Sequence, residues 1–159
     1  NKSDAFNLIS YELKREIRSD YELKKCFFQA VSNSSWANYG YLVAFEISRN
    51  LMDEMERLNQ SFGIGVIELS GNPYESKVLF QPKFKELDFK TMDKLCEING
   101  DFKRFIDQTK TILSAPEEYL KGIKKEFESF CDDFFKTDSE VEKYCEEKNI
   151  PLGKEDKTV

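Results

Sequence analysis

The chain has 159 residues, of which 34% are charged and 40% hydrophobic, and it contains 14 phenylalanines. This length and composition predict one folded domain with a hydrophobic core, not a disordered chain. The net charge of −6 argues against a broad nucleic-acid-binding surface but allows a local basic groove. Because the chain has no histidine, Ser-His-Asp catalysis, Cys-His catalysis and histidine-ligated zinc are excluded.

The composition also bears on the compartment in which the protein works. No apolar run approaches the roughly 20 residues that span a bilayer, and no signal peptide is recognisable. The four cysteines are scattered without a C-x-x-C pair, which favours a reducing cytoplasm over a disulfide framework. We therefore expect a cytoplasmic protein without a membrane partner. Because the chain begins at Asn1 and not at a methionine, we expect a fragment or a processed product.

The first half of the chain alternates between strand and helix patterns. A capping box formed by Ser19 and Glu22 predicts the start of a helix that ends near Gly40. Asn50 with Asp53 predicts the start of a second helix. The last β-rich run ends at a proline, which is typical of a strand at a sheet edge. Runs rich in β-forming residues predict strands over 6–17, 41–47, 63–69 and 77–82.

From residue 88 onward the patterns are helical. We expect Asp88, Asp101 and Ser139 at helix N-caps and Pro116 at an early helical position. The predicted helices cover residues 88–98, 100–113, 115–136 and 139–149. The aromatic stripe of the third of these helices is expected to be core, with homodimerisation through it as the alternative.

This order of elements predicts the fold class. Strands joined through helices imply parallel pairing in places. We predict an α/β fold with a mixed central sheet flanked by helices and with appended C-terminal helices. Residues 1–113 are expected to form the α/β core, and residues 114–159 a helical extension of the same domain.

The first predicted strand carries an unusual pair of charges. Positions two apart on a strand point to the same face, so Glu12 and Lys14 project side by side. With Asp4 they form the pattern D-x7-E-x-K. Converging carboxylates are good Mg²⁺ ligands, and a nearby lysine can orient water and offset phosphate charge. The alternative is a surface ion pair without a function. However, burying a charged pair within an apolar strand is unfavourable in free energy, so such a pair is more readily explained by a functional role.

At these residues the sequence resembles a known group of enzymes. The run DAFNLISYELK, followed by a helix and the strand YLVAFEI, resembles the PD-(D/E)XK nuclease superfamily. More narrowly, FFQAVSNSSWANYGYLVAFEI, ERLNQSFGIGVIEL and NGDFKRFI resemble HrgA-like bacterial proteins that are encoded beside restriction–modification genes. This narrower resemblance covers residues 4–113.

The resemblance implies specific roles on a restriction-endonuclease-like core. Asp4 and Glu12 would be Mg²⁺ ligands, Lys14 the lysine of the motif, and Gln29 a functional glutamine on the following helix. The chain also departs from the family pattern, and the gap of seven residues between Asp4 and Glu12 is at the short end for the superfamily. Ser3 stands where a proline is common, and the helix and strand that usually precede the acidic position are largely missing.

A polar stripe on the first predicted helix is a candidate DNA contact. Gln29, Ser32, Asn33 and Trp36 share one face because they are three or four residues apart. They would form a polar wall beside the carboxylates that touches phosphate or positions water. Alternatively, the serine and asparagine cap the helix end, and the tryptophan covers the core.

Basic residues interleaved with aromatic ones are a second candidate for DNA contact. Lys83, Lys85, Lys103 and Arg104 lie in such runs, a pattern that suits a nucleic-acid backbone. Alternatively, amphipathic elements place phenylalanine inward, and the lysine stems cover apolar surface.

Together these observations predict metal-dependent hydrolysis of a DNA phosphodiester, associated with a restriction–modification system. The alternative is a non-catalytic DNA- or protein-binding regulatory module on the same fold. A structural fragment without activity is a third reading.

Overall fold

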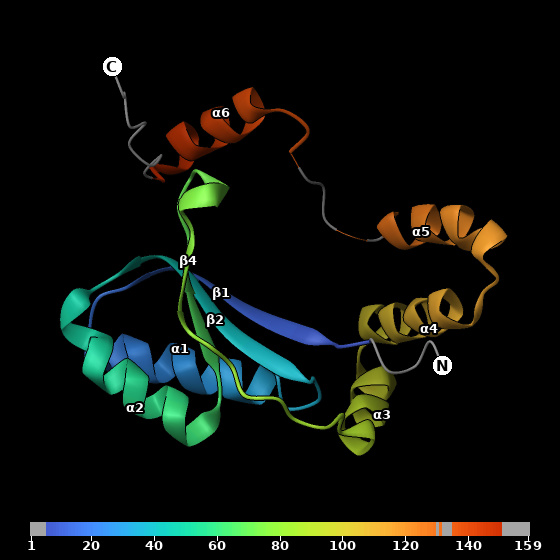
Figure 1. The fold of residues 1–159 in the computed structure, drawn as a ribbon, viewed down its shortest axis with the longest axis horizontal. Coiled ribbons are helices and arrows are strands. Elements are labelled where there is room, and N and C mark those ends of the chain that lie inside the picture. Colours follow the sequence, from blue (N-terminus) through green and yellow to red (C-terminus); the bar gives the residue numbers. More distant parts are fainter. Residues whose placement is uncertain (1–5, 130, 132–134, 151–159) are drawn as a thin grey trace. The chain divides into compact units, whose positions relative to one another are not determined.

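The structure is a computed structural model that describes residues 6–129, 131 and 135–150 (Figure 1). These residues divide into two compact units. The described residues of the first, here called the sheet unit, are 7–87 and 135–150. Those of the second, the helical unit, are 6, 88–129 and 131.

The sheet unit contains a four-stranded mixed sheet in the order β1-β2-β3-β4. Strands β1, β2 and β3 are parallel because a helix returns the chain after each of the first two, whereas β4 runs antiparallel to β3. The strands are β1 (Ile9–Ile17), β2 (Tyr39–Ile47), β3 (Gly65–Glu68) and β4 (Lys77–Phe80). The predicted α/β class with a mixed sheet is confirmed, as is the edge position of the last strand.

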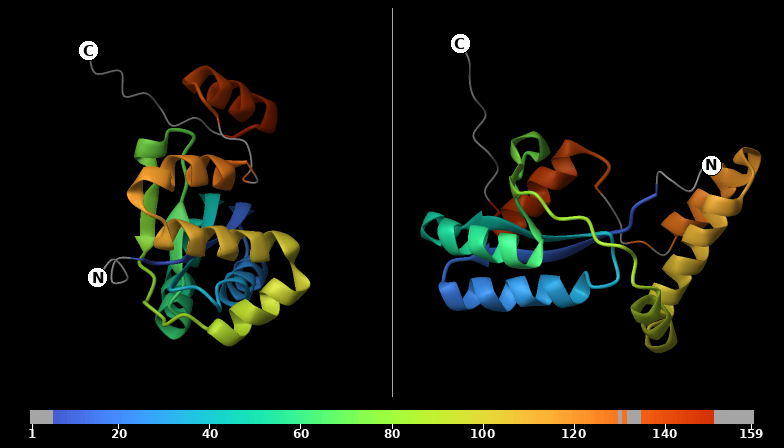
Figure 2. Two further views of the ribbon diagram at one scale, coloured as in Figure 1. Left: turned by 90° about the vertical axis from the view of Figure 1, so that its right-hand side faces the viewer. Right: turned by 60° about the horizontal axis from the view of Figure 1, so that its bottom comes forward.

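Two helices, α1 (Asp20–Asn33) and α2 (Met52–Phe62), cover one face of this sheet (Figures 1 and 2). Their apolar residues recur at helical spacing and meet the inward side chains of the strands. The buried cluster between the two layers comprises Ile17, Leu23, Cys26, Phe27, Ala30, Leu42, Ala44, Ile47, Leu51, Met55, Leu58, Ile64 and Val66.

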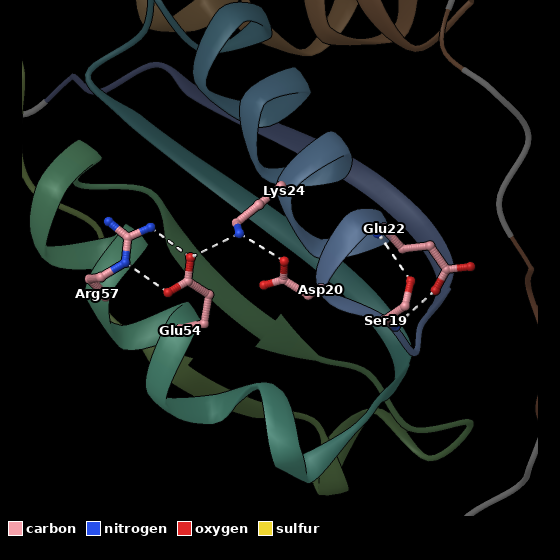
Figure 3. Close-up of polar contacts among 6 residues, drawn as sticks. All are labelled: Ser19, Asp20, Glu22, Lys24, Glu54 and Arg57. Atoms are coloured by element: carbon pink, nitrogen blue, oxygen red, sulfur yellow. Dashed lines mark hydrogen bonds and ion pairs between the residues drawn. The ribbon is translucent and has the colours of Figure 1, made fainter.

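The predicted capping box at the start of α1 is confirmed (Figure 3). The hydroxyl of Ser19 accepts a hydrogen bond from the backbone N–H of Glu22 at 3.2 Å. The Glu22 carboxylate accepts a bond from the backbone N–H of Ser19 at 3.1 Å. These bonds satisfy two backbone donors that the first turn leaves without helical partners.

Charged side chains also connect α1 to α2 on their outer surface (Figure 3). The Lys24 ammonium lies 2.7 Å from the Asp20 carboxylate and 3.7 Å from the Glu54 carboxylate on the other helix. Glu54 is itself paired with Arg57 at 2.6 Å. Because Lys24, Asp20 and Arg57 are solvent-exposed and Glu54 is only half-buried, these pairs contribute little to stability.

Helix α2 starts differently from the prediction. A 3₁₀ turn, η2 (Arg49–Leu51), precedes it, and Leu51 occupies the N-cap position without a side-chain cap. The predicted cap by Asn50 with Asp53 was therefore wrong, because the preceding turn moves the helix start past Asn50. The helix ends at Gly63, whose φ of +70° is the left-handed conformation that favours glycine.

The helical unit is a run of consecutively packed helices: α3 (Phe89–Ile98), α4 (Gly100–Ser114), the 3₁₀ turn η4 (Glu117–Tyr119) and α5 (Leu120–Glu128). The predicted cap Asp88 is confirmed, since its side chain accepts a bond from the backbone N–H of Thr91. The predicted cap Asp101 was wrong. Asn99 caps α4, because only one residue separates the two helices.

Helix α6 (Asp138–Lys148) belongs to the sheet unit. Its N-cap is Thr137, which forms a capping box with Glu140, so the predicted cap at Ser139 was two residues too late. The predicted boundary after residue 113 remains a prediction. No helix in the described part of the chain is long and apolar enough to cross a membrane.

Candidate functional site

Strand β1 presents its polar face to the helices and its apolar face to solvent. Ile9, Tyr11 and Leu13 are 41%, 53% and 68% exposed. The alternate positions Glu12 and Lys14 are half-buried and lie in register with Leu42 and Ala44 of β2, which belong to the core. Neighbours in register point to the same face of a sheet, so the charged pair lies on the side covered by α1.

On that face Glu12 is held by two partners. The Lys14 ammonium lies 2.7 Å from Glu12 Oε1, and the Asn33 amide donates a hydrogen bond to Glu12 Oε2, also at 2.7 Å. Only 16% of the Glu12 side chain and 26% of the Lys14 side chain are exposed. The predicted juxtaposition of Glu12 and Lys14 is confirmed, and it takes the form of a direct ion pair.

Asn33 reaches this site because it is the last residue of α1. The hydroxyl of Ser10 on β1 donates to the backbone carbonyl of Asn33 at 3.2 Å, which fixes the helix end against the strand. Of the residues predicted to form a polar wall on this helix face, Asn33 is thus the one that bonds the Glu12 carboxylate. Gln29 and Ser32, from the same stripe, have exposed side chains.

The surroundings shift the acidity of two groups. Burial raises the pKa of Glu12, but the hydrogen bonds from Lys14 and Asn33 and the charge of Lys14 together lower it by more. The pKa of Glu12 therefore lies below its ordinary value, and the carboxylate stays charged at neutral pH. Burial raises the pKa of the nearby Cys26 thiol, which disfavours the thiolate form that acts as a nucleophile.

The donor set of this site matches Mg²⁺ in kind but not in number. Carboxylate and amide oxygens are the ligands that this cation prefers, and Glu12 and Asn33 supply both types. Among the described residues, however, there is no group of three or more acidic or cysteine side chains that could hold a metal ion. Asp4, the other predicted ligand, lies outside the described residues.

The predicted DNA-contacting lysines are distributed over both units. In the sheet unit, the Lys83 ammonium donates to the carbonyl of Gln60 at 2.7 Å, and that of Lys85 to the carbonyl of Ser34 at 3.3 Å. Burial lowers the pKa of Lys85. Each lysine therefore bonds a backbone carbonyl near the end of a helix, and these contacts stabilise the fold.

Lys103 and Arg104 lie on α4 of the helical unit. Lys103 forms an ion pair with Asp107 one turn further along the same helix. Their predicted role in DNA binding remains a prediction.

Sequence reasoning missed a pocket at the carboxyl ends of the parallel strands. It has a volume of about 480 Å³ and is lined by Arg18, Phe45, Glu46, Ile47, Ser48, Arg49 and Glu68. Arg18 is paired with Glu46 at 2.9 Å, and Arg49 with Glu68 at 2.8 Å. Because each guanidinium already has a carboxylate partner, the pocket has no unbalanced positive charge for an anion.

No family model, no curated protein and no solved structure matches this chain.

Proposed function

We propose that Glu12 and Lys14 belong to a Mg²⁺-dependent site that hydrolyses a DNA phosphodiester. The observation that carries the proposal is the orientation of β1. The strand exposes Tyr11 and Leu13 to water and turns a glutamate and a lysine toward a helix. It therefore loses the stabilisation that burial of its apolar side chains would give. Such an arrangement is typical of a functional site.

The proposed roles follow from the contacts. Glu12 is a metal ligand together with Asp4, and Asn33 holds the Glu12 carboxylate in place through its hydrogen bond. Lys14 positions water and offsets phosphate charge. A bound Mg²⁺ would supply Lewis-acid stabilisation of the phosphate. Gln29, exposed one turn before Asn33, is a further contact for substrate.

The order of elements supports the proposal. The pair lies on a strand that leads through a helix into a parallel strand, and this is the arrangement that the resemblance to PD-(D/E)XK nucleases implies. A restriction-endonuclease-like core and an association with restriction–modification are part of the same proposal. The four cysteines are free, which supports a cytoplasmic location.

A second function is favoured by a different observation. Both carboxylate oxygens of Glu12 already accept a bond from a protein group, so the carboxylate has a structural role that needs no metal. A non-catalytic DNA- or protein-binding regulatory module would keep these bonds intact, and the pair would then only fix α1 against β1.

Calorimetric titration of Mg²⁺ and of Mn²⁺ into the wild-type chain and two variants separates these functions. Glu12→Gln removes the proposed ligand. Glu16→Gln is the matched control, because Glu16 lies on the same strand and pairs with Arg18 instead. Saturable binding that is lost only in Glu12→Gln, followed by metal-dependent plasmid cleavage, supports the nuclease. Absence of metal binding in the wild type, with DNA still bound, supports the module.

A further inference from the structure

Strand β1 is an edge strand of the sheet in the described part of the chain. It is nine residues long and lies at one end of the sheet, paired with β2 along one side only (Figure 1). Within the described part of the chain, no strand pairs with its other side. Such an edge offers a row of backbone N–H and C=O groups to another strand.

The outward side chains of β1 add an apolar surface to this edge. Ile9, Tyr11 and Leu13 are more than two-fifths exposed, and the Tyr11 ring stacks on Tyr41 of β2 with centroids 5.5 Å apart. A strand placed beside β1 would cover part of these side chains as well as the backbone edge.

The sequence of β1 selects its own copy as the partner. In a dimer of this kind the two copies of β1 are related by a two-fold axis perpendicular to the sheet. Residues that lie opposite each other must point to the same face of the sheet, and this holds only if the axis passes beside a residue that faces its own copy. Leu13 is the midpoint of Ile9–Ile17, so only an axis at Leu13 overlaps all nine residues. In that register Glu12 faces the partner's Lys14, and Lys14 faces the partner's Glu12.

The two neighbouring registers are unfavourable because each of them places like charges opposite each other. An axis at Glu12 places that carboxylate opposite its own copy, and an axis at Lys14 places two ammonium groups opposite each other. Like charges directly opposite on a sheet are destabilising, and opposite charges are stabilising. The axis at Leu13 also brings Tyr11 opposite the partner's Arg15, where a cation–π contact can form.

We propose that two copies of this chain associate through antiparallel pairing of β1 about Leu13. The two sheets then become one eight-stranded sheet, and each Glu12–Lys14 ion pair is joined by the same pair from the partner. The proposal goes beyond the proposed function, because it depends on the edge of β1 and not on metal or DNA.

Disulfide crosslinking tests the register directly. At the axis, the two copies of Leu13 have Cα atoms about 4.5–5.5 Å apart, within the range that a disulfide bridges. A Leu13→Cys variant is therefore expected to form a covalent dimer on mild oxidation. Tyr11→Cys is the matched control: it lies on the same face of the same strand, but about 13 Å along the strand from its own copy.

Wild-type protein provides the background from the native cysteines. A Leu13→Cys dimer well above that background, with Tyr11→Cys at background, supports the proposal. Equal crosslinking of the two variants overturns the register. A wild-type chain that stays monomeric in sedimentation equilibrium up to high concentration overturns the dimer itself.

Charge reversal supplies a second, independent test. Glu12→Lys and Lys14→Glu each place like charges opposite each other, so each variant alone is expected to associate about tenfold more weakly than the wild type. Mixed in equal amounts, they restore opposite charges at both positions, and a heterodimer of near wild-type affinity is expected. If the mixture associates no better than either variant, the proposed pairing is wrong.

Discussion

Asn38 shows how a single side chain holds the sheet unit together. Its side chain is buried, and its amide accepts a bond from the Leu8 N–H at 2.9 Å and donates to the Lys85 carbonyl at 3.0 Å. Its backbone bonds the same two residues. One residue thus joins the entry to β1, the start of β2 and the segment after β4.

We expect Asn38→Ala to lower the free energy of unfolding by about 2–4 kcal/mol, because a buried donor and a buried acceptor both lose their partner. Urea denaturation measures the change. Asn50→Ala is the control, since Asn50 is exposed, and it is expected to change stability by less than about 0.5 kcal/mol. A loss at Asn38 no larger than that of the control would contradict this role.

The lowered pKa of Glu12 predicts how stability depends on pH. In the unfolded chain the carboxyl group titrates near 4.5, and in the folded chain it titrates lower. The stabilisation is therefore complete above about pH 4.5 and is lost as the pH falls through the folded value.

Glu12→Gln is accordingly expected to lose less stability than the wild type when the pH is lowered from 7 to 3.5. Urea denaturation at a series of pH values measures this difference. Gln29→Ala, which removes no titratable group from α1, is the control and should retain the wild-type dependence on pH. Parallel curves for wild type and Glu12→Gln would show that the Glu12 contacts do not stabilise the fold.

At the scale of elements, sequence reasoning located the caps Ser19 and Asp88 but missed the starts of α2, α4 and α6. The box at Ser19 was predicted correctly because all its signals are local in sequence. At α2 and α4 the preceding element adjoins the helix and moves its start. Leu51 begins α2 after a 3₁₀ turn, and Asn99 caps α4 directly after α3 ends.

The contribution of the α1 cap is open to measurement. We expect Ser19→Ala to lower the free energy of unfolding by about 1 kcal/mol, because the N–H of Glu22 loses its acceptor. Ser32→Ala on the same helix is the control, because the Ser32 side chain is exposed. It is expected to be neutral or slightly stabilising, since alanine is the better helix former. Equal effects of the two changes would argue against the cap.

Strand β1 is the element that sequence reasoning located but could not orient. Alternation of polar and apolar residues defines two faces. Hydrophobicity alone would turn Ile9, Tyr11 and Leu13 inward, yet these residues are exposed. Which face of β1 points inward depends on the helix layer that packs against it. Helix α1 ends with Asn33 at the position where this side chain bonds Glu12.

At the scale of the whole molecule, the predicted DNA-binding residues belong to both units. If DNA binds the helical unit, Lys103 and Arg104 should each contribute a phosphate contact. Each substitution by alanine is then expected to reduce the slope of log K against log salt by about 0.9. Fluorescence anisotropy at several salt concentrations measures this slope. Lys94→Ala on α3 is the control, because Lys94 is not among the predicted DNA contacts, and it should leave the slope unchanged.

By itself the sequence determined the α/β class, four strand positions, the box that starts α1 and the Glu12–Lys14 pair. These features depend on residues close together along the chain, where propensity, alternation and capping operate. Only the tertiary structure decided which face of β1 meets the helices, that Asn33 is the amide that reaches Glu12, and that Asn38 joins three segments. Those contacts join residues 21 to 47 positions apart, and no local pattern encodes which distant groups satisfy one another.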